Sequence, residues 1–131
     1  MKHPLKQLLY WTPRVLGILY AAFISMFALD VFNEARGFWP TTIALLMHLI
    51  PTAIILIVLA ISWRWEWVGA ILFTAVGLAY TFKTLQHPHL APMIKLNWIL
   101  FIAGPLFLIG GLFFINWLCR KHLREKDCRR E

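Results

Sequence analysis

Five polar side chains lie inside or beside long apolar stretches of this 131-residue chain: Asp30, His48, Thr52, Tyr80 and Asn97. Ionisable and strongly polar groups are costly in a hydrocarbon environment, so they commonly mark functional sites or internal pairs there. An aspartate and a histidine in one pocket would form a proton-sensitive or ligand-binding centre. Two interpretations stay open: a polar pocket with an Asp30–His48 pair, or a structural hydrogen-bonded network that ties helices together.

A proline adds a further polar group to the same region. Pro51 has no N–H to donate to the carbonyl of Met47, so that oxygen is left without its helical partner beside His48. The five polar residues and this carbonyl are expected at a similar depth. We therefore treat the five side chains as a candidate ligand-binding set.

Catalytic and metal-binding patterns are absent from the sequence. The chain contains no GxSxG, HExxH, P-loop, Rossmann fingerprint or CxxC motif. His87 and His89 are expected to be solvated loop residues, and Cys119 and Cys128 have no metal-ligand spacing. We predict no catalytic residue, no cofactor and no metal.

The composition predicts the elements that position these residues. Hydrophobic residues make up 60% of the chain and charged residues 15%, and the mean hydropathy is +0.68. A soluble domain of this size could not cover so much apolar surface. Helices long enough to cross a hydrocarbon core of about 30 Å are expected over residues 13–32, 40–62, 66–85 and 93–118. The sequence thus predicts an all-α membrane protein, with four transmembrane helices in an up-down bundle.

The basic residues predict the orientation of this bundle. Four spans place the lead 1–12 and the tail 119–131 on one side of the membrane. That side would carry ten of the 13 Lys and Arg, namely Lys2, Lys6, Arg14, Arg64 and six residues of the tail. The opposite side would carry Arg36, Lys83 and Lys95. Positive charge is enriched in cytoplasmic flanks, so we expect both termini in the cytoplasm and a multi-pass protein of the inner (plasma) membrane.

A second group of charges lies near the expected cytoplasmic surface. Arg14 begins the first expected span, and Arg64 and Glu66 bracket the turn between the second and third spans. The sequence predicts a structural ion pair between Arg14 and Glu66, with Arg64 beside it. The expected partners are the lipid bilayer and either a second copy or another membrane protein. Nucleic acid is not expected, because the basic charge is concentrated in a membrane flank.

Three segments resemble a known group of proteins: PRVLGILYAAFISMFALDVF, MHLIPT and WRWEWVGA. They are similar to those of a family of small bacterial integral membrane proteins of unknown function, over the chain up to about Trp117. The resemblance implies four membrane helices and supplies no activity. It selects the following residues for first tests: Asp30, His48, Pro51, Arg64, Glu66 and Trp67.

The chain resembles two other classes of small membrane proteins more weakly. Small multidrug transporters have four helices and a membrane carboxylate in the first, but Asp30 is expected at the outer end of its helix. The DoxX-like proteins share only length and topology. We expect a non-enzymatic membrane component or accessory subunit. The alternative is a small proton-coupled carrier or ligand-binding protein that uses the outer-half Asp/His pocket, and a membrane enzyme is the third possibility.

Overall fold

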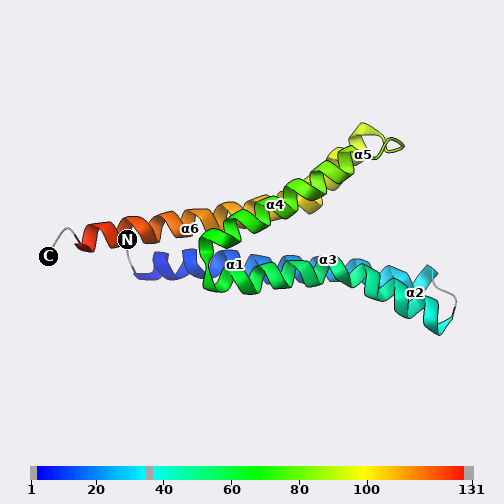
Figure 1. Cartoon of the computed structure of the whole chain (residues 1–131), viewed down its shortest axis with the longest axis horizontal. Coiled ribbons are helices and arrows are strands. Elements are labelled where there is room, and N and C mark those ends of the chain that lie inside the picture. The colour runs from blue at the N-terminus through cyan, green and yellow to red at the C-terminus, as the bar shows by residue number, and fades with distance from the viewer. Residues whose placement is uncertain (1–2, 35–36, 129–131) are drawn as a thin grey trace.

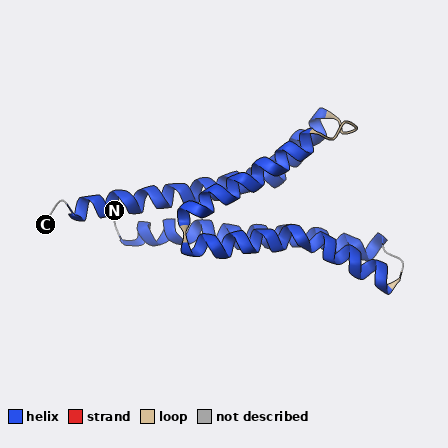
Figure 2. Ribbon diagram, viewed as in Figure 1, coloured by secondary structure: helices blue, strands red, loops and turns tan. Residues whose placement is uncertain are grey.

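The chain folds into two helical hairpins that are joined at a tight turn. The computed structural model describes the backbone of residues 3–34 and 37–128 and the side chains of residues 7–32 and 37–122. The described backbone is almost entirely helical, with short connections and no strand (Figure 2). The all-α prediction is therefore confirmed for this part of the chain. Of the basic flanking residues, Lys2, Arg36, Arg129 and Arg130 lie outside the described residues.

The first hairpin pairs α1 (His3–Met26) with α3 (Phe38–Arg64). The 3-10 turn η1 (Phe27–Asp30) and the short helix α2 (Val31–Glu34) extend the first arm, and the positive-φ residue Gly37 precedes α3. The two long helices lie side by side along the hairpin (Figure 1).

The prediction that the first helix starts at Pro13 is wrong, because α1 begins at His3 and contains Pro13 in its interior. A proline removes one helical donor and strains the preceding turn. Neighbouring side chains bond carbonyls of that turn: Thr12 Oγ1 donates to Leu8 O at 2.7 Å, and an Arg14 Nη1–H donates to Tyr10 O. These bonds support a helix that continues through the proline.

The second hairpin pairs α4 (Glu66–Leu85) with α5 (Pro92–Trp98), the π-helical turn η2 (Ile99–Ala103) and α6 (Gly104–Cys128). The prediction of a helix over 66–85 is confirmed. The helix expected over 93–118 is interrupted by η2 and continues further into the basic tail.

The π-helical turn has a cause in the sequence. Pro105 follows it and has no N–H for the carbonyl of Phe101, which disrupts the α-helical ladder. The N–H of Gly104 donates to Ile99 O, five residues back, rather than to the carbonyl four residues back as in an α-helix. Such turns are rare and frequently lie at functional sites.

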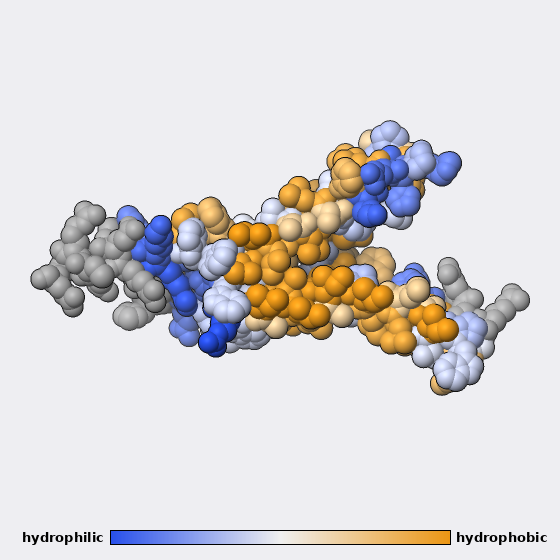
Figure 3. Space-filling model, in the orientation of Figure 1, coloured by the Kyte–Doolittle hydropathy of each residue, from blue (hydrophilic) through white to orange (hydrophobic). Residues whose placement is uncertain are grey.

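Within the described residues, four helices are long and apolar enough to cross a membrane: Gln7–Asp30, Phe38–Arg64, Glu66–Leu85 and Pro92–His122. Apolar residues form a broad band around the middle of the visible face, and hydrophilic residues gather toward both ends (Figure 3). Many large apolar side chains in this band are exposed, as expected of a surface that faces lipid.

The two hairpins pack together at one end and diverge at the other (Figure 1). Near the closed end, the rings of Phe73 and Phe113 are fully buried and stacked, with centroids 5.8 Å apart. The core continues along the bundle to Tyr20 and Leu106. Beyond these residues the hairpins separate, so the four helices form a V-shaped bundle rather than one that is closed throughout.

Candidate functional site

A cavity of ≈ 420 Å³ lies where the two hairpins begin to diverge. Both hairpins line it: α1 and α3 from one side, and α4, η2 and α6 from the other. Most lining residues are apolar, and Ile55 and Leu106 connect the cavity to the buried core. Three residues of the lining carry polar groups: Tyr20, His48 and Tyr80.

Tyr20 joins the two hairpins at this cavity. Its hydroxyl donates a hydrogen bond of 2.7 Å to the carbonyl oxygen of Ile102, which belongs to the π-helical turn. Both residues line the cavity, and the tyrosine side chain is 5% exposed. The bond therefore connects the first arm to the irregular turn of the second. The hydroxyl oxygen still has lone pairs that can accept a hydrogen bond.

His48 contributes an imidazole from α3. Its Nδ1 lies 2.9 Å from the carbonyl oxygen of Ala44, one turn earlier in the helix. A carbonyl only accepts, so Nδ1 carries the proton in this bond, and Nε2 of the neutral ring carries a lone pair. Pro51 lies beyond His48 on the same helix and also lines the cavity.

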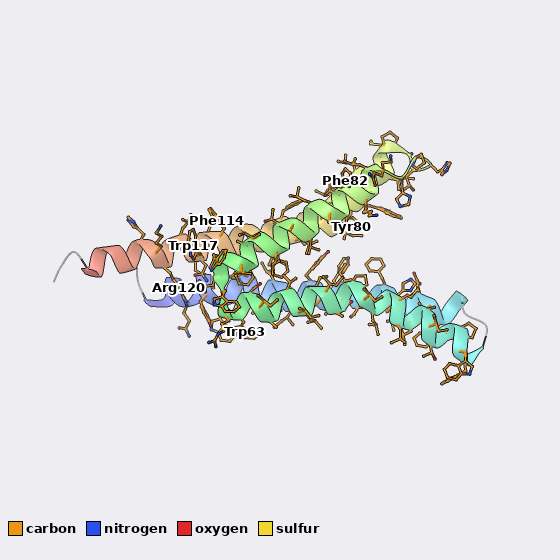
Figure 4. All side chains as sticks on the ribbon, in the orientation of Figure 1. Trp63, Tyr80, Phe82, Phe114, Trp117 and Arg120 are labelled. Carbon is orange, nitrogen blue, oxygen red and sulfur yellow. The ribbon has the colours of Figure 1, made fainter. Side chains whose placement is uncertain are left out.

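Tyr80 contributes a second phenol from the opposite arm. It extends from α4 on the side that faces the first hairpin (Figure 4). The cavity thus has one polar residue from each of three helices, set among apolar side chains. This arrangement can hold a mainly apolar molecule and bond a polar group on it.

The structure brings together two of the five candidate ligand-binding residues, His48 and Tyr80. Asp30, Thr52 and Asn97 are not among the lining residues of the cavity. Asp30 and Asn97 are exposed, at the end of η1 and in α5. Thr52 is buried, and its Oγ1 has no hydrogen-bond partner among the described residues.

Tyr20 is the polar residue of the cavity lining that the sequence did not lead us to expect. A signal was present, because its phenol lies in the middle of an apolar span and a buried hydroxyl needs a partner there. Tyr20, Ile24 and Phe27 also follow the spacing of one helical face, and all three line the cavity.

A second constellation lies at the closed end of the V, where Arg14 and Glu66 come together as the sequence suggested. Arg14 Nη2 donates to Glu66 Oε1 at 3.1 Å, and the two side chains are 1% and 6% exposed. The Arg14 guanidinium also lies 3.5 Å from the ring centroid of Tyr10. The pair connects α1 to the first turn of α4.

Two residues of this ion cluster were not anticipated. Asn116 of α6 donates from Nδ2 to Glu66 Oε1 at 2.9 Å, and Arg120 Nη1 lies 3.6 Å from the same oxygen. Asn116 is an isolated amide in an apolar stretch, which is the signal that could have found it. Arg64 is exposed and forms no ion pair with the other described residues. The cluster therefore connects α1, α4 and α6.

The described side chains include no group of three or more His, Cys, Asp or Glu that could hold a metal ion. Glu66 Oε1 is occupied by protein donors, and its carboxylate is buried. The ion cluster is therefore suited to joining helices, whereas the cavity has the space and the polar groups of a ligand site.

Comparison with known proteins gives the family. A family described as Domain of unknown function (DUF7670) matches residues 1–125. The chain belongs to this family. The DUF7670 match covers all residues of the cavity and of the ion cluster. No curated protein and no solved structure matches the chain.

Proposed function

We propose that this protein is a membrane-embedded binding protein that holds a small, mainly apolar molecule in the cavity between its hairpins. The observation that carries the proposal is the cavity itself, ≈ 420 Å³ in volume, with Tyr20, His48 and Tyr80 among apolar lining residues. Pockets for small molecules commonly have volumes of about 300–1,000 Å³ and a few polar groups in an apolar wall.

Insertion into a membrane is supported by the four apolar helices and by the hydrophobic band between hydrophilic ends (Figure 3). The closed end of the V carries Arg14 and Arg120 at Glu66, Arg64 at the end of α3, and Lys121 next to Arg120 on α6. By the distribution of positive charge we assign this end to the cytoplasm, in an inner (plasma) membrane. The cavity then opens in the outer half of the bilayer.

The polar groups of the cavity define the ligand chemistry. His48 Nε2 and the Tyr20 hydroxyl oxygen accept hydrogen bonds, and the Tyr80 hydroxyl donates or accepts one. A hydroxyl group on the ligand matches this set, because it donates and accepts. The favoured ligand is therefore a compact hydrocarbon body with a hydroxyl or similar group.

This proposal keeps the non-enzymatic role that the sequence suggested and changes the residues of the site. His48 and Tyr80 remain, and Tyr20 takes the place that Asp30 had in the Asp/His pocket. The proton-coupled carrier has less support, because the carboxylate of Asp30 lies outside the cavity lining.

Photocrosslinking in intact membranes tests the proposal. The variant Phe27→p-benzoylphenylalanine places a reactive ketone at the cavity, and the same change at Phe82 is the matched control. Both phenylalanines are exposed, at 49% and 62%, but only Phe27 lines the cavity. We expect the Phe27 variant to capture a small molecule that the Phe82 variant does not. Identical adducts of bulk phospholipid at both positions would refute the proposal.

A further inference from the structure

A second hollow lies between α4 and α6 and shares no lining residue with the cavity between the hairpins. It is a groove of ≈ 750 Å³. The groove is almost wholly apolar, and its lining combines large apolar and aromatic side chains with the small residues Ala70, Ala75, Gly110 and Gly111. Because it runs along two candidate membrane spans, its contents would come from the hydrocarbon layer.

The two adjacent glycines have different roles in this groove. A methyl group at Gly110 would lie 2.8 Å from Thr74 Oγ1, so this glycine allows α4 and α6 to pack closely. A methyl group at Gly111 would have no heavy atom within 4 Å beyond its two chain neighbours and the nearby backbone of its own helix. The missing side chain at Gly111 therefore leaves space in the groove.

The cytoplasmic end of the groove is aromatic and positively charged. Trp67 and Trp117 line it, and Lys121 Nζ lies 5.7 Å from the ring centroid of Trp117. Arg120 follows Trp117 on α6; its side chain is 59% exposed, and its Nη1 lies 3.6 Å from Glu66 Oε1 in the ion cluster. The nearby carboxylate of Glu66 is buried and already bonded to Arg14 and Asn116. Positive charge therefore dominates the exposed surface at this end.

We infer that the groove, together with Lys121, binds an anionic phospholipid of the surrounding bilayer. One acyl chain lies against Gly111, and the phosphate is held at the level of the indoles by the lysine. Tryptophan favours the membrane interface, and a basic residue near an anionic membrane surface is attracted to the lipid headgroups. The charge at the groove end favours this occupant over a second copy of the chain, for which the groove offers no complementary group.

Lipid retention by the purified full-length protein tests the inference. The protein is equilibrated in nanodiscs of equal parts phosphatidylglycerol and phosphatidylcholine, and lipids that remain after transfer to detergent are counted by native mass spectrometry. We expect the wild type to retain phosphatidylglycerol several-fold over phosphatidylcholine. Lys121→Gln should reduce that preference, whereas Lys83→Gln, at the opposite end of α4, should leave it unchanged.

The groove itself is tested by Gly111→Leu, which fills it. Gly104→Leu is the matched control, because Gly104 also has open space at its Cβ position and does not line the groove. Gly111→Leu should reduce retention of both lipids, and Gly104→Leu should not. Three results would overturn the inference: no lipid preference in the wild type, a wild-type preference in Lys121→Gln, or wild-type lipid retention in Gly111→Leu. A dimeric wild type that becomes monomeric in Gly111→Leu would also overturn the inference. These substitutions are expected to leave retention of the cavity ligand unchanged. The result of this test is therefore independent of the proposed function.

Discussion

Arg14 Nη2 lies 3.1 Å from Glu66 Oε1, at the end of the molecule where the two hairpins meet. Asn116 adds a third helix to this contact. The second contact between hairpins, from Tyr20 to Ile102, lies further along the bundle at the cavity. The hairpins are therefore joined by polar bonds at two levels and separate beyond the second.

Loss of one partner of the buried ion pair should strongly destabilise the bundle. Arg14→Met leaves the Glu66 carboxylate buried without its main counter-charge, and such a loss costs about 3–5 kcal/mol. Denaturation in mixed detergent micelles, followed by circular dichroism, measures the change. Arg64→Met is the control, because Arg64 is exposed. The double variant Arg14→Met/Glu66→Leu should be more stable than Arg14→Met alone. Equal stability of Arg14→Met and wild type would show that the pair does not hold the helices.

The bond between the hairpins at the cavity should make a smaller contribution. Tyr20→Phe removes the donor to Ile102 O, and hydrogen bonds between membrane helices are worth about 0.6 kcal/mol on average and about 1.7 at most. The same denaturation assay should show a loss in this range. Tyr80→Phe should leave stability unchanged, since no hydrogen bond from its hydroxyl to the described protein residues is present. If both variants matched the wild type, the Tyr20–Ile102 bond would not stabilise the fold.

The turn between the hairpins should be sensitive to a single added methyl group. A Cβ at Gly69 would lie 2.6 Å from Ser62 Cβ and 3.2 Å from its backbone Cα, which cannot move freely. A Cβ at Gly17 would come closest to Leu59 Cδ1, the flexible end of a side chain. Overpacking typically costs about 1–3 kcal/mol. We expect Gly69→Ala to lower the unfolding free energy within that range and Gly17→Ala to lower it less. The reverse order of stability would contradict the packing described for the turn.

Hydropathy and charge were sufficient to predict the helices, because a span of apolar residues has a simple length requirement. The bounds of α4 agree with those expected from the sequence, and Arg14 and Glu66 were found because each lies where the sequence predicted a span to begin. The extension of α1 through Pro13 was not predictable from helix signals. It depends on side-chain bonds from Thr12 and Arg14 that the sequence alone does not define.

The cavity was predicted only in part. The depth of a residue along a helix can be counted from the sequence, but the direction in which its side chain faces in the packed bundle cannot. His48 and Tyr80 were expected at a similar depth, and both line the cavity. Asp30 lies in a 3-10 turn, where the number of residues per turn differs from that of the α-helix, and its side chain is exposed. The acceptor for Tyr20 depends on a π-helical turn, and the helical period of the sequence gives no indication of it.

Native mass spectrometry of the protein released from its own membranes into mild detergent tests the central claim most directly. The wild type should retain one small molecule that is not a bilayer phospholipid. Val76→Phe, which fills the cavity from α4, and His48→Phe, which removes the imidazole, should lose it. Val15→Phe at an exposed site and Asp30→Asn should keep it. A wild type without any retained molecule, or one whose retained molecule survives Val76→Phe and His48→Phe, would contradict a ligand site between the hairpins.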